Sequence, residues 1–307
     1  MTDTHTDQSP ATQTPSANPV TRFLRATEID TRLLGMVGAL LLIWIGFHLT
    51  GYYKNGFAAF LTPRNLWNLS VQTSSIGIMA TGMVLVIVTR HIDLSVGSIL
   101  GFAAIVMGVL QVNILPQYLG LGHPLIWIIA VLAGILVGAL VGAFHGWLIA
   151  YLTIPAFIVT LGGLLVWRGV AFLVARGETI SPVDPTFALL GGGPYGAVGA
   201  TGSWIVGLLA IVAILWILVS SRKRRADHGF AQRPVWAEGV LAVLGCGAVI
   251  GSVLLVNAYT WPKGIVNQYA AANAIVVPEG GLDISYGFAI PVLIMIGVGI
   301  AMTILMT

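Results

Sequence analysis

A short polar segment, TRHIDLSVGS, stands at residues 89–98 between two long apolar runs. Asp93 and Ser95 are residue types that cap a helix N-terminus, because a side-chain oxygen accepts a hydrogen bond from a free backbone N–H. A negative charge there also complements the helix dipole, so a plain capped turn is one interpretation. Gly97, Ser98 and Gly101 follow inside the next apolar run, where each glycine costs about 1 kcal/mol relative to alanine in a soluble helix. Small residues at that place favour a second interpretation, a mechanical joint at which another backbone approaches closely.

The apolar run before this segment carries a polar stripe on one helical face. Its members are spaced three or four residues apart: Asn65, Asn68, Gln72 and Ser75. Lipid offers no hydrogen-bond partner, so the stripe should face the protein interior or water. Two interpretations stay open. The stripe lines a pathway for a polar solute, or it forms hydrogen bonds between helices near the outer surface.

A single arginine, Arg168, interrupts another apolar run, LLVWRGVAF. It lies about thirteen residues into the span predicted at 155–175, or roughly 20 Å at helical rise. An arginine at such a depth costs at least about 2.5–3.5 kcal/mol unless it snorkels, finds a partner or meets water. One hypothesis therefore gives Arg168 a role beside a solute or in linking helices around a cavity. The other lets it snorkel to the outer surface, helped by Trp167 as an interfacial aromatic.

The segment AGILVGALVGAFHG contains glycines four residues apart, just over one helical turn: Gly134, Gly138, Gly142 and Gly146. This spacing predicts a groove along one helix face into which another helix packs. His145 stands beside the groove. We interpret it as an interhelical hydrogen-bonding residue, because no second His or Cys stands at metal-ligand spacing, and we expect no metal site.

The composition places these residues in a membrane. Of 307 residues 57% are hydrophobic and 8% charged, against roughly 25% charged in soluble domains. Several apolar runs reach the ~20 residues needed to cross a bilayer as helix. The sequence therefore predicts an all-α polytopic membrane protein, and so few charges give no sign of nucleic-acid binding. We expect eight spans, at about 33–53, 66–89, 94–114, 125–149, 155–175, 203–221, 239–259 and 287–306.

The hydrophilic segments predict how the chain is organised around these spans. Residues 1–20 are rich in Thr, Ser, Pro and Gln and are expected to form a disordered cytoplasmic tail, followed by one transmembrane domain over residues 21–307. With the N-terminus cytoplasmic, nine Lys and Arg residues fall inside and four outside, including the run SRKRR at 221–225 inside. By the positive-inside rule, this orientation is favoured. The segment 89–98 then lies at the cytoplasmic side.

Prolines and glycines are expected to bound the spans. Pro63, Pro116, Pro124 and Pro155 are predicted to start or end helices, and GGGPYGAVGATG at 191–202 is predicted to be non-helical. The single cysteine, Cys246, lies in an apolar run, so no intrachain disulfide is possible.

Three segments resemble the permease subunits of bacterial monosaccharide ABC importers, the ribose, galactose and xylose permeases, and the xylose type most. They are NLWNLSVQTSSIGIMATG (65–82), MVLVIVTRHIDLSVGSILG (83–101) and the stretch from GAFHGWLIAY to GETISP (142–182). The most specific motifs are IDLSVGS, the FIVTLGG that follows Pro155, and the RG at 168–169 with ISP at 180–182. The resemblance runs from about residue 33 to residue 307.

The resemblance implies a transport subunit of the bacterial inner membrane, not an enzyme. It implies a second permease subunit as a homodimer partner, an ABC ATPase that binds and hydrolyses ATP, and a periplasmic sugar-binding protein. The imported solute would be a monosaccharide, xylose or a related sugar. No cofactor is expected on this chain, which contains no GxxxxGK[ST] phosphate loop. Family members usually continue after the equivalent of AMTILMT with a basic loop that docks into the ATPase, so we expect this chain to be C-terminally incomplete relative to them.

An ion-coupled secondary transporter of a polar solute is the main alternative. That class favours carboxylates inside the membrane and symmetric repeats. Here Asp93 and Asp283 stand only at span edges, and the echo of IDLSVG in LDISYG at 282–287 is too short to establish a repeat. A membrane-embedded enzyme would need converging His, Asp, Ser or Cys side chains, and the sequence shows no such cluster. We also expect Asp93→Asn to impair transport more than Ser203→Ala, which alters a hydroxyl predicted at a loop edge.

Overall fold

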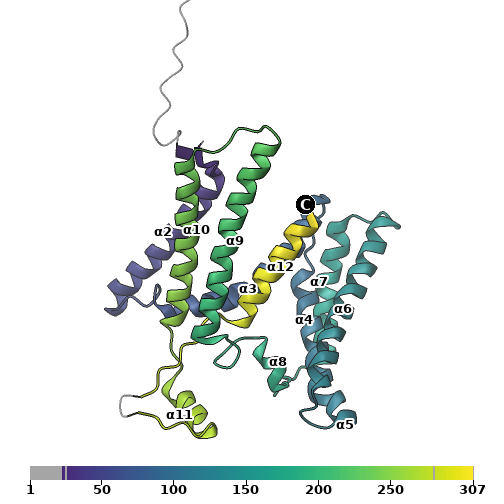
Figure 1. Ribbon diagram of the computed structural model, residues 1–307. Coiled ribbons are helices and arrows are strands. Elements are labelled where there is room, and N and C mark those ends of the chain that lie inside the picture. The colour runs from purple at the N-terminus through teal and green to yellow at the C-terminus, as the bar shows by residue number, and fades with distance from the viewer. Residues whose placement is uncertain (1–22, 25, 279–280, 307) are drawn as a thin grey trace, which may run out of the picture. The chain divides into compact units, whose positions relative to one another are not determined.

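The computed structural model describes residues 23–24, 26–278 and 281–306 (Figure 1). The tail predicted at residues 1–20 lies outside the described residues. The chain divides into two compact units. The first comprises the N-terminal segment up to Thr62 together with Trp204–Leu254, and the second comprises Pro63–Ser203 together with the segment from Leu255 onward.

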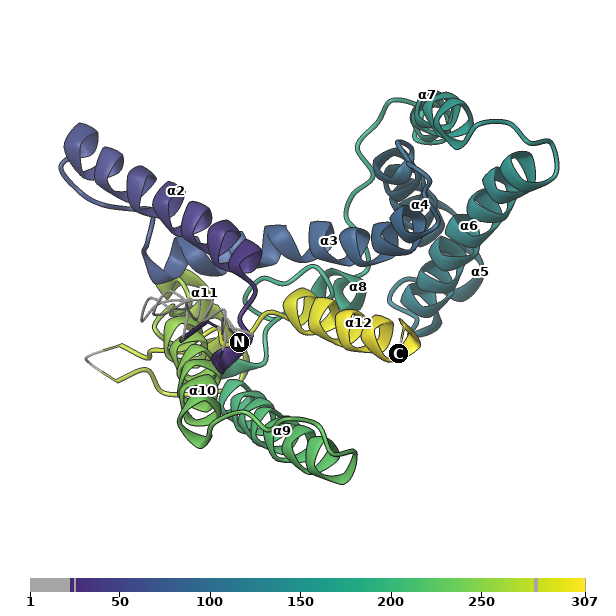
Figure 2. The same ribbon diagram turned by 90° about the horizontal axis from the view of Figure 1, so that it is seen from above.

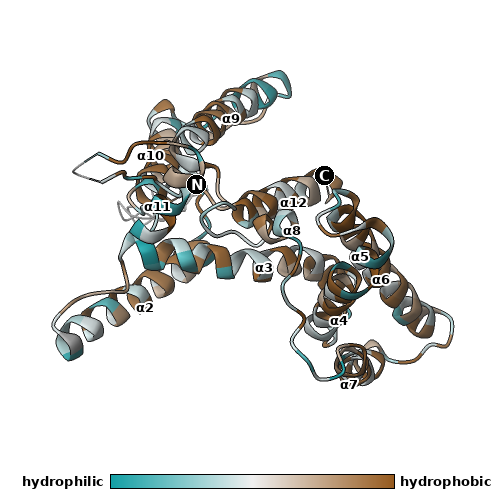
Figure 3. Cartoon of the chain, turned by 90° about the horizontal axis from the view of Figure 1, so that it is seen from below, coloured by the Kyte–Doolittle hydropathy of each residue, from teal (hydrophilic) through white to brown (hydrophobic). Residues whose placement is uncertain are grey.

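The described residues form helices and isolated β-bridges, without a regular strand. Seven helices among them are long and apolar enough to cross a membrane: α2 (Thr31–Asn55), α3 (Pro63–Val88), the run Val96–Leu119, α6 (Leu125–Ala150), α7 (Ala156–Val174), α9 (Gly199–Asp227) and α10 (Val235–Asn257). The eighth predicted span corresponds to a shorter apolar helix, α12 (Ile290–Met306). The expected polytopic all-α membrane protein is confirmed. Figure 3 shows these helices as mainly hydrophobic, with a hydrophilic C-terminal end on α9.

Prolines mark several helix starts, as predicted. Pro63 is the first residue of α3, and Pro124 and Pro155 immediately precede α6 and α7. A proline suits such places because its missing N–H is not needed in the first helical turn.

Pro116 lies in the first turn of a short helix, as predicted for a residue that starts a segment, but the apolar run does not end there. The run Val96–Leu119 continues through it as α4 (Val96–Val109), a π-helical turn η1 (Leu110–Ile114) and α5 (Leu115–Leu119). The wider π turn lets the chain resume as α5 with the proline in its first turn, where no N–H is required. The segment 191–202 was likewise predicted to be wholly non-helical, but α9 begins at Gly199.

The second unit contains two packed groups of helices. In the first group α4 lies against α6 and α7, and α3 packs on α12 in the second (Figure 2). The buried residues of α6 share one face: Ile126, Ala130, Gly134, Val141 and His145. That face repeats at intervals of four and seven residues, as expected for a helix that packs along one side.

An aromatic core joins α3 and α12 to the polypeptide around them. Trp67 of α3 is buried, and its Nε1–H donates to the carbonyl of Gly287 (2.8 Å). Its ring lies 4.7 Å from that of Tyr286, which stacks on Tyr259 at 4.4 Å. Contacts between aromatic rings stabilise the folded state by more than the apolar area they bury. The core therefore fixes the segment immediately before α12. This segment includes LDISYG.

The first unit is tied together by ion pairs at its basic end. Glu28 accepts two hydrogen bonds of 2.8 Å from Arg225 and one of 2.7 Å from Arg233. Arg222 pairs with Glu238 at 2.6 Å. The bonds from Arg225 and Arg233 lower the pKa of the Glu28 carboxyl from 4.5 to about 2. Part of the SRKRR run is thus held by acidic partners in the same unit.

The Glu28→Gln variant should be slightly less stable at pH 7. The carboxylate side chain is 43% exposed, so solvent screening limits its contribution to at most about 1 kcal/mol. Because the folded pKa is depressed, this contribution is complete above the ordinary pKa of 4.5 and is lost as pH falls through about 2. Thermal unfolding in detergent at pH 7 and at pH 3 should show a difference between the variant and the wild type that shrinks in acid. A difference that grows in acid would contradict this assignment.

Candidate functional site

The polar segment 89–98 forms the turn between α3 and α4. Helix α3 ends at Val88, and Arg90 then adopts a left-handed conformation with φ of 62°. The backbone N–H of His91 returns to the carbonyl of Val86 (3.1 Å), which closes a Schellman turn. The positive charge of Arg90 suits the C-terminal end of a helix dipole.

Asp93 organises the start of α4 without being its N-cap residue. Its Oδ1 accepts hydrogen bonds from the backbone N–H of Ser95 (2.7 Å) and from the Ser95 hydroxyl (2.6 Å). Ser95 occupies the N-cap position but makes no side-chain capping bond. Ser98 donates its hydroxyl to the Ser95 carbonyl (2.7 Å). Three of the four residues of the predicted joint are therefore linked directly to one another.

The contacts of Ser95 extend from this turn into the helix bundle. Ser95 is fully buried, and its Oγ lies 3.4 Å from Nδ1 of His145 on α6. The other ring nitrogen of His145, Nε2, accepts a hydrogen bond from Trp167 Nε1–H on α7 (3.0 Å). The interpretation of His145 as an interhelical hydrogen-bonding residue is confirmed. Asp93, Ser95, His145 and Trp167 form a continuous chain of polar contacts, which we call the polar relay.

In the polar relay each residue donates a hydrogen bond to the next, from Trp167 through His145 and Ser95 to Asp93. The Ser95 hydroxyl donates to Asp93, so its oxygen can accept from His145 Nδ1–H. The Trp167 indole can only donate, so Nε2 of His145 must be unprotonated. The contacts therefore select one neutral tautomer of His145, with its hydrogen on Nδ1.

Helix α7 carries the small residues that make room for the relay. Thr160 Oγ1 donates to the Ile92 carbonyl (3.3 Å) and so attaches α7 to the polar segment. Gly163 faces the imidazole, and a Cβ there would lie 2.5 Å from His145 Cε1. Both residues belong to the motif FIVTLGG, but no contact with His145 or with the segment 89–98 was predicted for them. With Trp167 they stand three and four residues apart in TLGGLLVW, a helical spacing that could have identified this face.

Trp167 was considered as an interfacial aromatic that helps Arg168 to snorkel, and its contacts differ from that role. The Trp167 indole stacks on Phe102 of α4 at 5.4 Å and donates to His145, so it belongs to the interior of the α4–α6–α7 group. Arg168 is the next residue and is exposed on a different face of α7. Successive residues of a helix point about 100° apart, so the two side chains cannot share a face.

The polar stripe lies on the open side of α3. Asn65 and Asn68 are half-buried, Gln72 and Ser75 are exposed, and the Ser75 hydroxyl donates to the Gln72 carbonyl (3.2 Å). The aromatic core covers the opposite side of this helix. Because α3 packs on α12 whereas α7 packs on α4 and α6, the structure does not bring Arg168 and the stripe into one site.

The four glycines of α6 do not act as one packing groove within this chain. A Cβ on Gly134 would meet the Met107 side chain of α4 at 2.5 Å. At the other three positions, Gly138, Gly142 and Gly146, it would meet no described atom within 4 Å. Gly97 is open in the same way. The close approach predicted for these glycines is thus seen only at Gly134.

Ser203 was predicted at a loop edge, and this is wrong. It is fully buried in the first turn of α9. Its Oγ donates to the Gly199 carbonyl and accepts from the backbone N–H of Phe288, each at 2.8 Å. Ser203→Ala would therefore leave a buried N–H without its acceptor, and it is unsuitable as a neutral control.

Residues 65–223 match the family described as the branched-chain amino acid transport system / permease component. This stretch is just over half of the 307 residues and contains the whole polar relay. The chain belongs to this permease family. No solved structure matches the permease.

Known transport proteins are similar to the permease over most of its length. The xylose transport system permease protein XylH of Escherichia coli K12 is 33% identical over 77% of this chain and 56% of XylH. The inner membrane ABC transporter permease protein YjfF of the same strain is 34% identical over 62% of this chain and 56% of YjfF. The autoinducer 2 import system permease protein LsrC of Escherichia coli O157:H7 is 30% identical over 72% of this chain and 64% of LsrC. The chain thus spans 56% of XylH, 56% of YjfF and 64% of LsrC.

Proposed function

We propose that this permease is the membrane-spanning subunit of an ATP-driven importer of a monosaccharide, xylose or a related sugar. The observation that carries the proposal is the similarity to XylH across 77% of the chain. The apolar helices of the chain, which are long enough to span a membrane, also support the proposal. The pathway residues stay a proposal: the stripe of Asn65, Asn68, Gln72 and Ser75 offers donors and acceptors for hydroxyl groups, and Arg168 is exposed on another helix.

The partners follow from the same proposal. An ABC ATPase that binds ATP sits on the cytoplasmic side, a periplasmic sugar-binding protein docks outside, and a second copy of the permease completes the pathway in the inner membrane. The charge bias supports a cytoplasmic N-terminus. The exposed apolar faces of the spanning helices and the open glycines of α6 are compatible with lipid and a neighbouring subunit around them.

The polar relay supports a mechanical role for the segment 89–98. It links the start of α4 to α6 and α7 at the end that the charge bias places toward the ATPase. Thr160 adds a further bond from α7 to the same segment. We infer that the relay makes these three helices respond together when the ATPase subunits close.

Uptake into membrane vesicles that carry the complete system tests the proposed function. Labelled D-xylose should accumulate when ATP and the binding protein are present, and an uncoupler should not prevent it. The ion-coupled alternative requires the reverse, because such a transporter depends on the ion gradient and not on ATP. Loss of uptake with the uncoupler alone would overturn the importer.

Asp93→Asn should reduce initial D-xylose uptake about tenfold at equal membrane levels. An asparagine oxygen can still accept from Ser95, but the charge that strengthens both bonds is removed, and a charge-assisted bond exceeds a neutral one by about 1 kcal/mol or more. Asp227→Asn, at the end of α9, removes the same charge outside the relay and should leave uptake unchanged. If Asp93→Asn transports like the wild type, the carboxylate only orders the turn.

A further inference from the structure

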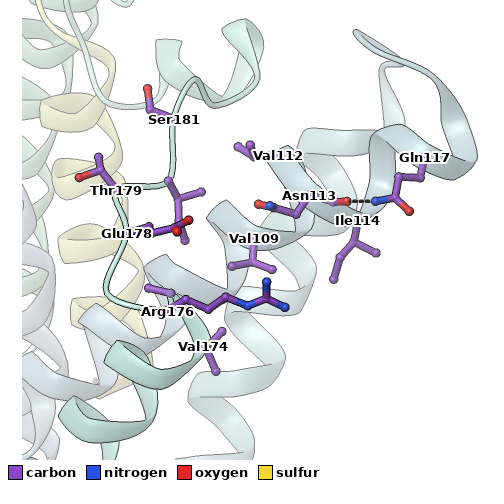
Figure 4. A pocket seen from close by; sticks show the side chains of 12 residues that line it. Val109, Val112, Asn113, Ile114, Gln117, Val174, Arg176, Glu178, Thr179 and Ser181 are labelled. Carbon is purple, nitrogen blue, oxygen red and sulfur yellow. Dashed lines mark hydrogen bonds between the residues drawn. The ribbon is translucent and has the colours of Figure 1, made fainter.

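A cavity of about 600 Å³ lies at the opposite end of α4 from the polar relay. One wall is formed by η1 and α5, and the other by the segment that follows α7 (Figure 4). Half of its lining residues have polar side chains: Asn113, Gln117, Arg176, Glu178, Thr179 and Ser181. The volume is within the range of pockets that hold small molecules. With the orientation that the charge bias favours, this pocket opens on the external side.

Two contacts hold the walls of the pocket together. The buried Gln111 of η1 accepts a hydrogen bond from the backbone N–H of Asp184 at its Oε1 (3.1 Å). Ile180 packs so closely on Gly108 that an added Cβ would lie 3.2 Å from it. The segment after α7 is thus attached to the π-helical turn, and Asn113 projects from the same turn into the space between them (Figure 4). π-Helical turns are often found at functional sites.

Arg176 occupies a backbone position that favours glycine. It follows the end of α7 with φ of 55°, and the N–H of Gly177 returns to the Phe172 carbonyl (3.1 Å) in a Schellman turn. Glycine adopts this left-handed conformation without a steric cost, whereas an arginine in the same conformation is strained by its Cβ. The Arg176 side chain extends along the floor of the pocket toward the helix that carries Asn113 (Figure 4). A strained residue whose side chain lines a cavity is a sign of function.

The lining suits a neutral solute with several hydroxyl groups. Arg176 donates hydrogen bonds and Glu178 accepts them, while the amides and hydroxyls do both. The two formal charges cancel, so the pocket does not favour an anionic headgroup. We propose that this pocket binds the monosaccharide on the external side of the permease, which rests on the proposed function. The hydroxyl groups of the sugar are held between Asn113 on η1 and the side chains of Arg176 and Glu178.

Cysteine protection tests the site directly. Cys246 is the single cysteine, so Cys246→Ser gives a cysteine-free background in which Val112→Cys on η1 and, separately, Thr179→Cys on the segment after α7 report on the two walls. Right-side-out vesicles with the complete system are treated with a membrane-impermeant maleimide. D-Xylose should slow the labelling of both reporters at least threefold, and L-leucine should not. Tyr118→Cys, which is 80% exposed beside the pocket, should be labelled at the same rate with and without sugar.

Arg176→Gly separates binding from stability. The glycine relieves the left-handed strain, so the thermal midpoint should stay the same or rise, while about tenfold more D-xylose should be needed to protect Thr179→Cys. Ala274→Gly is the matched control, because Ala274 follows the end of α11 (Lys263–Ala272) with φ of 53° and does not line the pocket. Ala274→Gly should have the same thermal midpoint as Arg176→Gly. The D-xylose concentration that protects Thr179→Cys should be the same in Ala274→Gly as in the wild type.

The outcomes distinguish this inference from the proposed function. ATP-dependent uptake of D-xylose with no protection at either reporter would overturn the pocket and leave the importer standing. Protection without uptake would support the pocket and count against the importer. Labelling only in inside-out vesicles would overturn the external placement. Protection by L-leucine, or by phosphatidylglycerol added to the vesicles, in place of D-xylose would overturn the choice of ligand.

Discussion

His145→Leu should reduce transport more than tenfold and lower the stability of the α4–α6–α7 group. The imidazole is 6% exposed and contacts both Ser95 and Trp167. Leucine fills similar space but leaves the N–H of the half-buried Trp167 without its acceptor, at a cost of about 1 kcal/mol. The connection from Trp167 through His145 to Ser95 is also broken. We expect a loss of more than tenfold in ATP-dependent uptake and a fall of several degrees in the thermal midpoint in detergent.

Two further variants show whether His145 acts through the relay. His228→Leu replaces an exposed histidine that follows α9, and it should change neither ATP-dependent uptake nor the thermal midpoint. Trp167→Phe removes the N–H but keeps a ring against Phe102, and should have a smaller effect than His145→Leu. Because the two residues contact each other, the double variant should cost less than the sum of the single variants. Simple additivity, or normal uptake by His145→Leu, would contradict a mechanical role for the relay.

Gly287→Ala should prevent stable folding of the second unit. Gly287 has φ of 71°, in the left-handed region that favours glycine. A Cβ there would also collide with the Gly199 carbonyl and the Ser203 hydroxyl. One of these is backbone and cannot swing aside, so the cost is expected to exceed about 3 kcal/mol. The yield of monodisperse protein and its thermal midpoint after detergent extraction measure the effect.

Gly297→Ala provides the control for this variant. It lies ten residues further along the chain, inside α12, and an added Cβ would meet no described atom within 4 Å. Alanine in a helix interior is preferred over glycine, so this variant should be at least as stable as the wild type. If Gly287→Ala is as stable as Gly297→Ala, the aromatic core does not constrain the chain as described.

Features that depend on local chemistry could be predicted. The spanning helices follow from long apolar runs, and Pro63, Pro124 and Pro155 mark helix starts because a proline ring lacks an N–H. The interhelical role of His145 was predicted because no second His or Cys stands at metal-ligand spacing from it. The continuation of the run past Ile114 to Leu119 was not predicted, because the π-helical turn before Pro116 has no sequence signal comparable to that of proline.

The motif IDLSVG and its echo LDISYG show what sequence alone could not decide. In the first, Asp93 binds Ser95 and the glycine enters a helix. In the second, Asp283 is exposed, and the Ser285 hydroxyl donates to the Asn257 carbonyl (2.8 Å). The same residue pattern therefore forms a helix start in one place and a close backbone contact in the other.

The sequence by itself determined the class of protein, the positions of most spanning helices and the segment 89–98 as a special place between two of them. Those properties depend on hydrophobicity and on the backbone preferences of individual residues, which act over a few positions. The tertiary structure decided that Asp93, Ser95, His145 and Trp167 meet. It also decided that Arg168 does not join the polar stripe. Which helix faces meet depends on packing between segments far apart in the chain, and a single sequence carries no direct signal of that packing.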